Sequence, residues 1–165
     1  MSQPSPSKGS LVREEDRAWA GFWVFVESLP PGALEENGSP ERWSARDILA
    51  HVGSWHAEAA VMLEQLRMGT YGGWDEDRLD EINRDWWEAW GDQDVHAVLA
   101  HLHSSRARML EELVRLPDEL LDDTAVDWFR DSGAGHYEEH LPSLRELSAR
   151  GNPRKSGEAD LESGQ

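Results

Sequence analysis

Apolar residues recur every three to four positions along most of the chain, and this spacing predicts a protein built from α-helices. Four long amphipathic segments are expected, over residues 11–29, 45–68, 95–116 and 135–149. Residues 75–90 predict a shorter helix, and 118–133 predict a short helical turn and a loop. Alternation of apolar and polar residues never persists long enough to predict a strand. The predicted fold class is therefore all-α, an antiparallel four-helix bundle with additional short helices.

Residues at the ends of these segments support the helix assignments. Ser44 predicts an N-cap, with Asp47 three residues later as the reciprocal partner of a capping box. Gly69 is expected to end the same helix, and Asp94 to cap the segment that follows. Pro142 lies inside the last helix, where it removes a backbone hydrogen bond and predicts a kink.

The length of 165 residues fits one domain, predicted over residues 10–150. The segments 1–9 and 151–165 are rich in polar residues, Ser and Pro, and are expected to be disordered. No stretch approaches the ~20 consecutive apolar residues that span a bilayer. The N-terminus also lacks the apolar core of a signal peptide, so a cytoplasmic location is predicted.

The chain is strongly acidic, with 16 Lys and Arg against 33 Asp and Glu and a formal net charge of −17. Such a surface repels phosphate backbones and anionic lipids, so neither nucleic acid nor a membrane is an expected partner. The negative field favours metal cations and neutral or cationic small molecules, although solubility alone is the simpler explanation. The absence of cysteine excludes disulfides, thiolate ligands and a cysteine nucleophile.

Two histidines one helical turn apart, His136 and His140, lie on an apolar stripe that Leu144 continues. His51 lies on the inward face of the second long helix, far upstream in the chain. Two imidazoles from one helix and a third from a neighbour can hold one divalent metal ion. Three such ligands leave at least one coordination position open, which suits activation of water or binding of a thiolate.

An alternative is that these three imidazoles are core histidines, each satisfied by hydrogen bonds. The other four histidines are weaker candidates for metal ligands. His96, His101 and His103 lie beside or opposite the apolar stripe of their helix, so solvated positions are expected. His56 is expected to point away from the direction of His51.

Glu58 and Asn83 are the candidate catalytic residues. Glu58 lies two helical turns after His51 on the same face. It could act as a general base, hold an imidazole in place by a hydrogen bond, or simply be a carboxylate at the edge of the bundle. Asn83 could orient a substrate carbonyl or bond to backbone. Trp55, Trp86 and Tyr137 are the candidate substrate-binding residues, for which ordinary core packing is the simpler interpretation. Further tryptophans could complete an apolar pocket: Trp87, Trp90 and Trp128.

The chain resembles the DinB-like (YfiT-like) superfamily of four-helix-bundle metalloproteins. Within it, the chain is most similar to the DfsB branch, which includes ClbS-like self-resistance proteins of colibactin producers. The resemblance covers residues 11–147. It is carried by RWSARDILAHVGSWH (Arg42 to His56), LDEIN (Leu79 to Asn83), the helical segment 94–116 ending in LVRLPDELL, and HYEEH (His136 to His140).

This resemblance implies a metal between helices, held by His51, His136 and His140. Superfamily activities include thiol-dependent transfer, isomerisation and hydrolysis, and the colibactin-resistance relative is similar to a hydrolase that opens an electrophilic cyclopropane. Pro142, His56 and the nine tryptophans depart from the pattern and leave the substrate open.

The resulting hypothesis is a metal-dependent hydrolase or transferase that acts on a reactive small molecule, in detoxification or self-resistance. Its cofactor would be a divalent metal such as Zn or Ni. One alternative is a non-catalytic protein that sequesters such a molecule in an aromatic pocket. A third is an interaction module, a homodimer that uses an exposed Trp87 as its contact surface.

Overall fold

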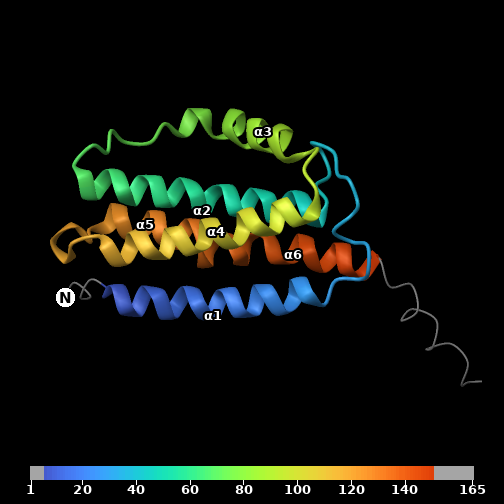
Figure 1. The fold of residues 1–165 in the computed structure, drawn as a ribbon, viewed down its shortest axis with the longest axis horizontal. Helices are drawn as coiled ribbons and strands as arrows, with labels where there is room; N and C mark the ends of the chain where they lie inside the picture. The colour runs from blue at the N-terminus through green and yellow to red at the C-terminus, as the bar shows by residue number, and fades with distance from the viewer. Residues whose placement is uncertain (1–5, 151–165) are drawn as a thin grey trace, which may run out of the picture.

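The structure, a computed structural model, describes residues 6–150 and contains no strand over that range (Figure 1). An isolated bridge joins Ser39 and Arg42. Its helices are α1 (Lys8–Glu27), α2 (Ala45–Met68), η1 (Glu76–Arg78), α3 (Leu79–Trp90), α4 (Val95–Arg115), η2 (Asp118–Leu120), α5 (Asp123–Ser132) and α6 (Ala134–Arg150). The all-α prediction is confirmed.

The helix ends follow the predicted signals. The Ser44 side chain accepts a hydrogen bond from the Asp47 backbone N–H, and the Asp47 carboxylate accepts one from the Ser44 N–H, so the capping box is confirmed. Gly69 ends α2 in the left-handed conformation, φ 70°, which costs a glycine little. Asp94 caps α4 through the N–H of Ala97 at 2.8 Å.

Several boundaries differ from the predicted ones. α1 begins at Lys8, three residues early and within the segment expected to be disordered, because Ser7 caps it by accepting from the Ser10 N–H. α6 continues through Pro142 to Arg150, and the kink expected there stays a prediction. The segments 1–5 and 151–165 lie outside the described residues.

The bundle is not antiparallel throughout. Contacts between α2 and α4 advance in the same direction along both helices: Gly53 approaches His101, Glu64 pairs with Arg108, and Arg67 pairs with Glu112. α2 and α4 are therefore parallel, because the segment 69–94, which contains α3, returns the chain along the outside of α2 (Figure 1). α1 runs parallel to the α5–α6 pair by the same criterion, since Glu14 pairs with Arg130 and Phe22 stacks on Tyr137.

The short helical turn expected in the segment 118–133 is present as η2, but the loop expected after it is wrong. Asp122 accepts a hydrogen bond from the Ala125 N–H at 2.9 Å and starts the ten-residue helix α5. Val126 and Phe129 project from one face of α5 into the core. The helix is short and mostly polar, so its apolar pattern is too brief to be recognised from the sequence alone.

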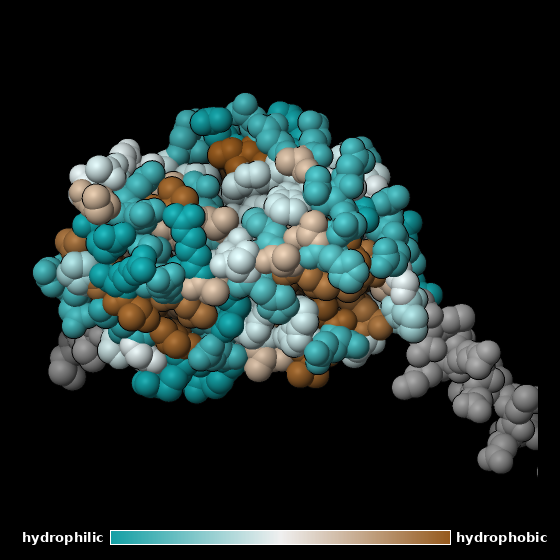
Figure 2. All heavy atoms as spheres, viewed as in Figure 1, coloured by the Kyte–Doolittle hydropathy of each residue, from teal (hydrophilic) through white to brown (hydrophobic). Residues whose placement is uncertain are grey.

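Two apolar clusters occupy the two ends of the bundle. One contains Phe22, Leu49, Val52, Leu102 and Leu144, and the other contains Leu11, Leu63, Met109, Leu113 and Phe129. The face drawn in Figure 2 is mostly hydrophilic, with apolar patches between hydrophilic side chains. Among the described helices, none combines the length and apolar character that crossing a membrane requires.

The close contact of α2 with α4 gives a test of the packing. A Cβ built on Gly53 would lie 2.8 Å from His101 Cδ2 and 3.1 Å from Leu102 Cα, both closer than van der Waals contact allows. Gly53→Ala is therefore expected to lower the free energy of unfolding by about 1–3 kcal/mol, measured by urea denaturation. Gly21→Ala on α1 is the control, because nothing lies within 4 Å of its Cβ position. It should stabilise the protein by about 0.5–1 kcal/mol, and equal effects at both sites would contradict this account of the α2–α4 contact.

Candidate metal centre and adjoining cavity

Three imidazoles from two antiparallel helices converge at the middle of the bundle. α2 presents His51, and α6 presents His136 and His140 from successive turns. Each pair of rings has its centroids 4.9 Å apart. One nitrogen from each ring lies within 4.8 Å of the others, and the Nε2 atoms of His51 and His136 are 3.0 Å apart. The structure thus brings together the three histidines that were predicted as ligands.

The surroundings of the three rings suit a metal ion. His136 Nδ1 lies 3.2 Å from the backbone oxygen of Asp131, which fixes this nitrogen as the donor and leaves Nε2 with its lone pair. His51 Nδ1 and His140 Nε2 are buried and have no hydrogen-bond partner within residues 6–150. Two nitrogens that each lie ~2.1 Å from one ion are ~3.0 Å apart at an angle of ~90°. The observed spacing of the first pair therefore fits a shared ion.

Burial also keeps the three rings neutral, as metal ligands must be. The pKa of His51 falls from 6.5 to about 2, mainly through burial and then through the neighbouring His136 and His140. Burial, followed by repulsion from His140, lowers the pKa of His136 to about 4. The pKa of His140 is lowered as well, again by burial. At neutral pH none of the three rings carries the positive charge that would repel a metal cation.

A cavity of about 680 Å³ opens beside His51 and His136. Its walls come from α2, α3, α5, α6 and the segment between α2 and α3. The remaining lining residues are Trp55, Tyr71, Trp74, Glu76, Leu79, Asn83, Thr124, Asp127, Trp128, Asp131, Ser132, Gly135 and Glu139. Two of the three candidate metal ligands thus line a space large enough for a small molecule.

The other predicted site residues divide into two groups. Trp55 and Asn83 line the cavity, and Trp86 packs edge-on against Trp55 at 5.2 Å. Glu58 is half-buried and is not part of the lining, and Tyr137 is turned into the core with only 2% of its surface exposed. A helix presents successive residues about 100° apart, so Tyr137 cannot share the direction of the adjacent imidazole.

The sequence did not predict most of the carboxylates that line the cavity, nor some of its aromatic lining residues. Tyr71 and Trp74 lie in the irregular segment after α2, where periodicity carries no information. Asp127 and Asp131 are one turn apart on α5, a segment in which only a helical turn and a loop were expected. Trp87, expected to be exposed, is half-buried and faces α2 together with Trp86 and Trp90.

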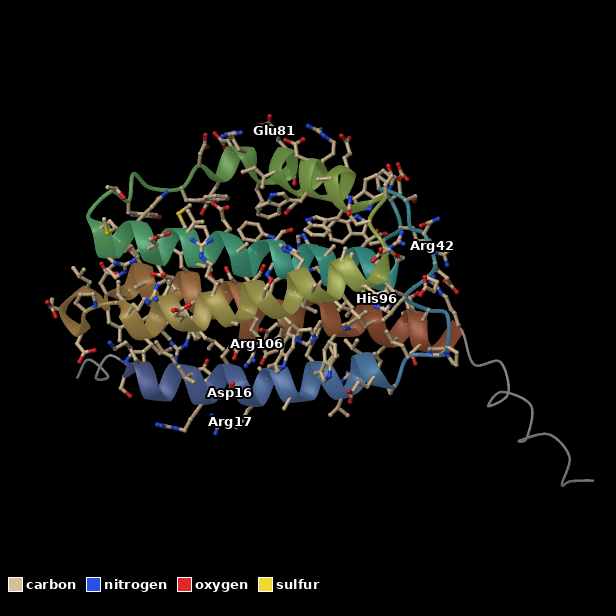
Figure 3. All side chains as sticks on the ribbon, in the orientation of Figure 1. Asp16, Arg17, Arg42, Glu81, His96 and Arg106 are labelled. Atoms are coloured by element: carbon tan, nitrogen blue, oxygen red, sulfur yellow. The ribbon has the colours of Figure 1, made fainter. Side chains whose placement is uncertain are left out.

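A second cluster of buried polar groups lies on the opposite side of α6 from the cavity. The Tyr137 hydroxyl donates to Glu15 Oε1 at 2.6 Å and accepts from His56 Nε2 at 2.9 Å. Arg106 donates to both oxygens of Glu15 and also to Asp16. Figure 3 shows Asp16 and Arg106 facing each other where α1 meets α4. His56 is therefore a fully buried member of a network that joins four helices.

The remaining histidines are mostly exposed, as expected. His96 and His103 lie on the surface of α4, and His103 packs edge-on against Trp23. His101 is instead half-buried, stacked on Trp90 with ring centroids 4.2 Å apart. None of these three faces the candidate metal centre.

Comparison with known proteins places these features in context. The sequence model described as the DinB superfamily matches residues 15–141, which include all three histidines of the centre. A crystal structure of an uncharacterised protein from Escherichia coli UTI89 is similar, with a TM-score of 0.71 and 14% sequence identity. The similarity covers 90% of this chain and 97% of that chain, and at this identity it shows a shared fold alone. No curated protein matches the chain.

The buried imidazole of His56 predicts a dependence of stability on pH. Burial, with smaller contributions from His136 and Arg106, lowers the pKa of His56 from 6.5 to about 3. Between these values the unfolded chain binds a proton that the folded protein excludes. The contribution of His56 to the free energy of unfolding is therefore fully present above pH 6.5. It decreases below that pH by up to ~1.4 kcal/mol per pH unit.

Urea denaturation in EDTA between pH 7 and 5 measures this slope. His56→Gln keeps a donor for Tyr137 and should make the slope shallower. His96→Gln, at an exposed position on α4, should leave it unchanged. Equal slopes in both variants would show that His56 is not held neutral.

Proposed function

The chain belongs to the DinB superfamily, and on that premise we propose that it is a metal-dependent hydrolase or transferase acting on a reactive small molecule. The observation that carries the proposal is the convergence of three neutral imidazoles, two of which line an aromatic cavity. More narrowly, the motifs favour the DfsB branch and a role in detoxification or self-resistance. A cytoplasmic location and a homodimeric state stay predictions.

His51, His136 and His140 would hold the ion, with zinc or nickel the best matches to an all-imidazole site. When bound, such an ion supplies Lewis acidity and lowers the pKa of a water or thiol at an open coordination position. The protein itself keeps the three rings neutral and holds them in the orientation that a shared ion requires. The backbone carbonyl of Asp131 accepts a hydrogen bond from His136 Nδ1 and so fixes the tautomer and orientation of that ring.

The cavity walls would orient the substrate and limit the access of water. Trp55, Trp74 and Trp128 pack against one another, with ring centroids between 5.2 and 6.4 Å apart. The Trp128 indole N–H donates to the Tyr71 hydroxyl at 3.1 Å, which ties the segment after α2 to α5. Asn83 offers an amide at the cavity margin for a substrate carbonyl or hydroxyl.

Asp131 is better placed for proton transfer than Glu58. Burial, together with repulsion from Asp127, raises the pKa of the Asp131 carboxyl above its usual value. This carboxyl lines the cavity, and its residue holds His136 through the backbone. Burial raises the pKa of Glu58 too, but Glu58 does not line the cavity. We therefore assign the general acid–base role to Asp131.

The aromatic wall supports a second candidate function, sequestration without chemistry. A continuous surface of indole rings binds flat apolar molecules whether or not a reaction follows. Catalysis is distinguished from storage by the fate of the bound compound.

Metal content tests the centre directly. The wild-type protein, purified without chelator, should contain about one divalent ion per chain by inductively coupled plasma mass spectrometry. His51→Ala, His136→Ala and His140→Ala should each lose most of it, because two imidazoles bind an ion far more weakly than three. His96→Ala, on the exposed face of α4, is the control and should retain it. A metal-free wild type that also fails to take up zinc or nickel would overturn the assignment.

Product analysis tests the reaction. Small aromatic epoxides, activated cyclopropanes and esters are incubated with the protein, with and without a thiol, and followed by mass spectrometry. Hydrated or thiol-adducted product supports catalysis, whereas unchanged compound that co-purifies with the protein supports sequestration. Asp131→Asn should slow turnover by about 100-fold. Asp123→Asn removes the same charge from the same helix outside the cavity and should not.

A further inference from the structure

We propose that the cavity selects a cationic small molecule with an aromatic or flat apolar body, and that it rejects anionic compounds. This inference rests on the proposed function for the use of the site and names the class of its substrate. Two independent features of the lining carry it: the sign of its charges and the arrangement of its tryptophans.

The charged lining residues are all acidic. Glu76 comes from η1, Asp127 and Asp131 from α5, and Glu139 from α6. No Lys or Arg lines the cavity, and none of the four carboxylates forms an ion pair within the described part of the chain. Their negative potential is therefore not compensated by the protein.

The arginines closest along the chain are engaged elsewhere. Arg130, between the two acidic residues of α5, pairs with Glu14 on α1 at 2.9 Å. Arg78, at the end of η1, pairs with Glu81 at 3.3 Å on the exposed face of α3. A ligand cation is therefore the natural counterion for this cavity, since a concave space lined by carboxylates from three helices concentrates positive charge.

The aromatic wall gives the cation a second attraction. Trp74 stands edge-on to Trp128 at 5.2 Å and to Trp55 at 5.8 Å, while Trp55 and Trp128 are inclined by only 31°. The three indoles thus form a corner. Ring faces attract cations through their quadrupole, tryptophan most strongly, and also stack on flat apolar groups. Carboxylates beside indole faces suit an ammonium group attached to an aromatic body.

The same potential bears on a thiol co-substrate. A thiol that carries free carboxylates would be repelled by the cavity, whereas water or a neutral or cationic thiol would not. The lining therefore favours hydrolysis, or transfer to a thiol without net negative charge.

Three probes with one indole body separate charge from shape: tryptamine, tryptophol and indole-3-acetate. Binding is measured by isothermal titration calorimetry on the protein as purified and again after EDTA treatment. Tryptamine should bind at least about fivefold more tightly than tryptophol, and indole-3-acetate should bind most weakly. A higher salt concentration should reduce the difference in affinity between tryptamine and tryptophol, because salt screens the charges.

A double variant and a matched control test the origin of the preference. Glu76→Gln/Asp127→Asn removes two lining charges and should abolish most of the preference for tryptamine over tryptophol. Asp77→Asn/Asp123→Asn removes two charges from the same short helices, at exposed positions outside the lining, and should leave the preference intact. If both double variants lose the preference for tryptamine over tryptophol to the same extent, the preference comes from the overall charge of the protein, and the proposal is overturned.

The outcomes also separate this proposal from the proposed function. Tryptophol binding as tightly as tryptamine, in either sample, overturns the cationic substrate class even if the protein contains its metal. A wild-type protein that is metal-free as purified, fails to take up zinc or nickel and still prefers tryptamine overturns the metal centre and leaves the charge selectivity standing.

Discussion

Four helices of this bundle are held in register by a layer of polar groups, most of which have almost no access to water. Between the two apolar clusters, Glu15, His56, Arg106 and Tyr137 meet in one layer. A carboxylate that is 1% exposed is stable only with a charged partner and further donors, and this one receives both. A slip of any one of these helices would leave a buried charge or donor unpaired, so the layer specifies how α1, α2, α4 and α6 align.

The candidate metal centre lies against this layer. Tyr137 directs its hydroxyl into the network, and the adjacent His136 directs its ring toward His51 and the cavity. α6 is thus fixed from one side and presents its imidazoles from the other. α2 is arranged in the same way: His51 points toward the candidate metal centre, and His56 points toward the buried polar network. Rigid positioning of this kind is what a metal site of three ligands requires.

Most of the cavity lining comes from the segment 69–94 and from α5, and α2 and α6 complete it. The segment 69–94 returns the chain along α2 and supplies Tyr71, Trp74, Glu76 and Asn83 to the lining. α5 supplies the facing wall. Because the segment 69–94 contains no buried residue, its side chains can differ in charge and shape without disturbing the bundle. The acidic, aromatic character of the cavity is therefore a property of these segments rather than of the fold.

The sequence by itself determined the helices with strong periodicity, the capping box at Ser44, and the three histidines that share inward faces, because each of these rests on local spacing. The family resemblance at the superfamily level agreed with that pattern. Only the tertiary structure decided that α2 and α4 run parallel, that α5 is a helix, and that Tyr137 faces the core instead of the cavity. It alone assembled the cavity. These features depend on contacts between residues far apart in the chain, which spacing along one helix cannot encode.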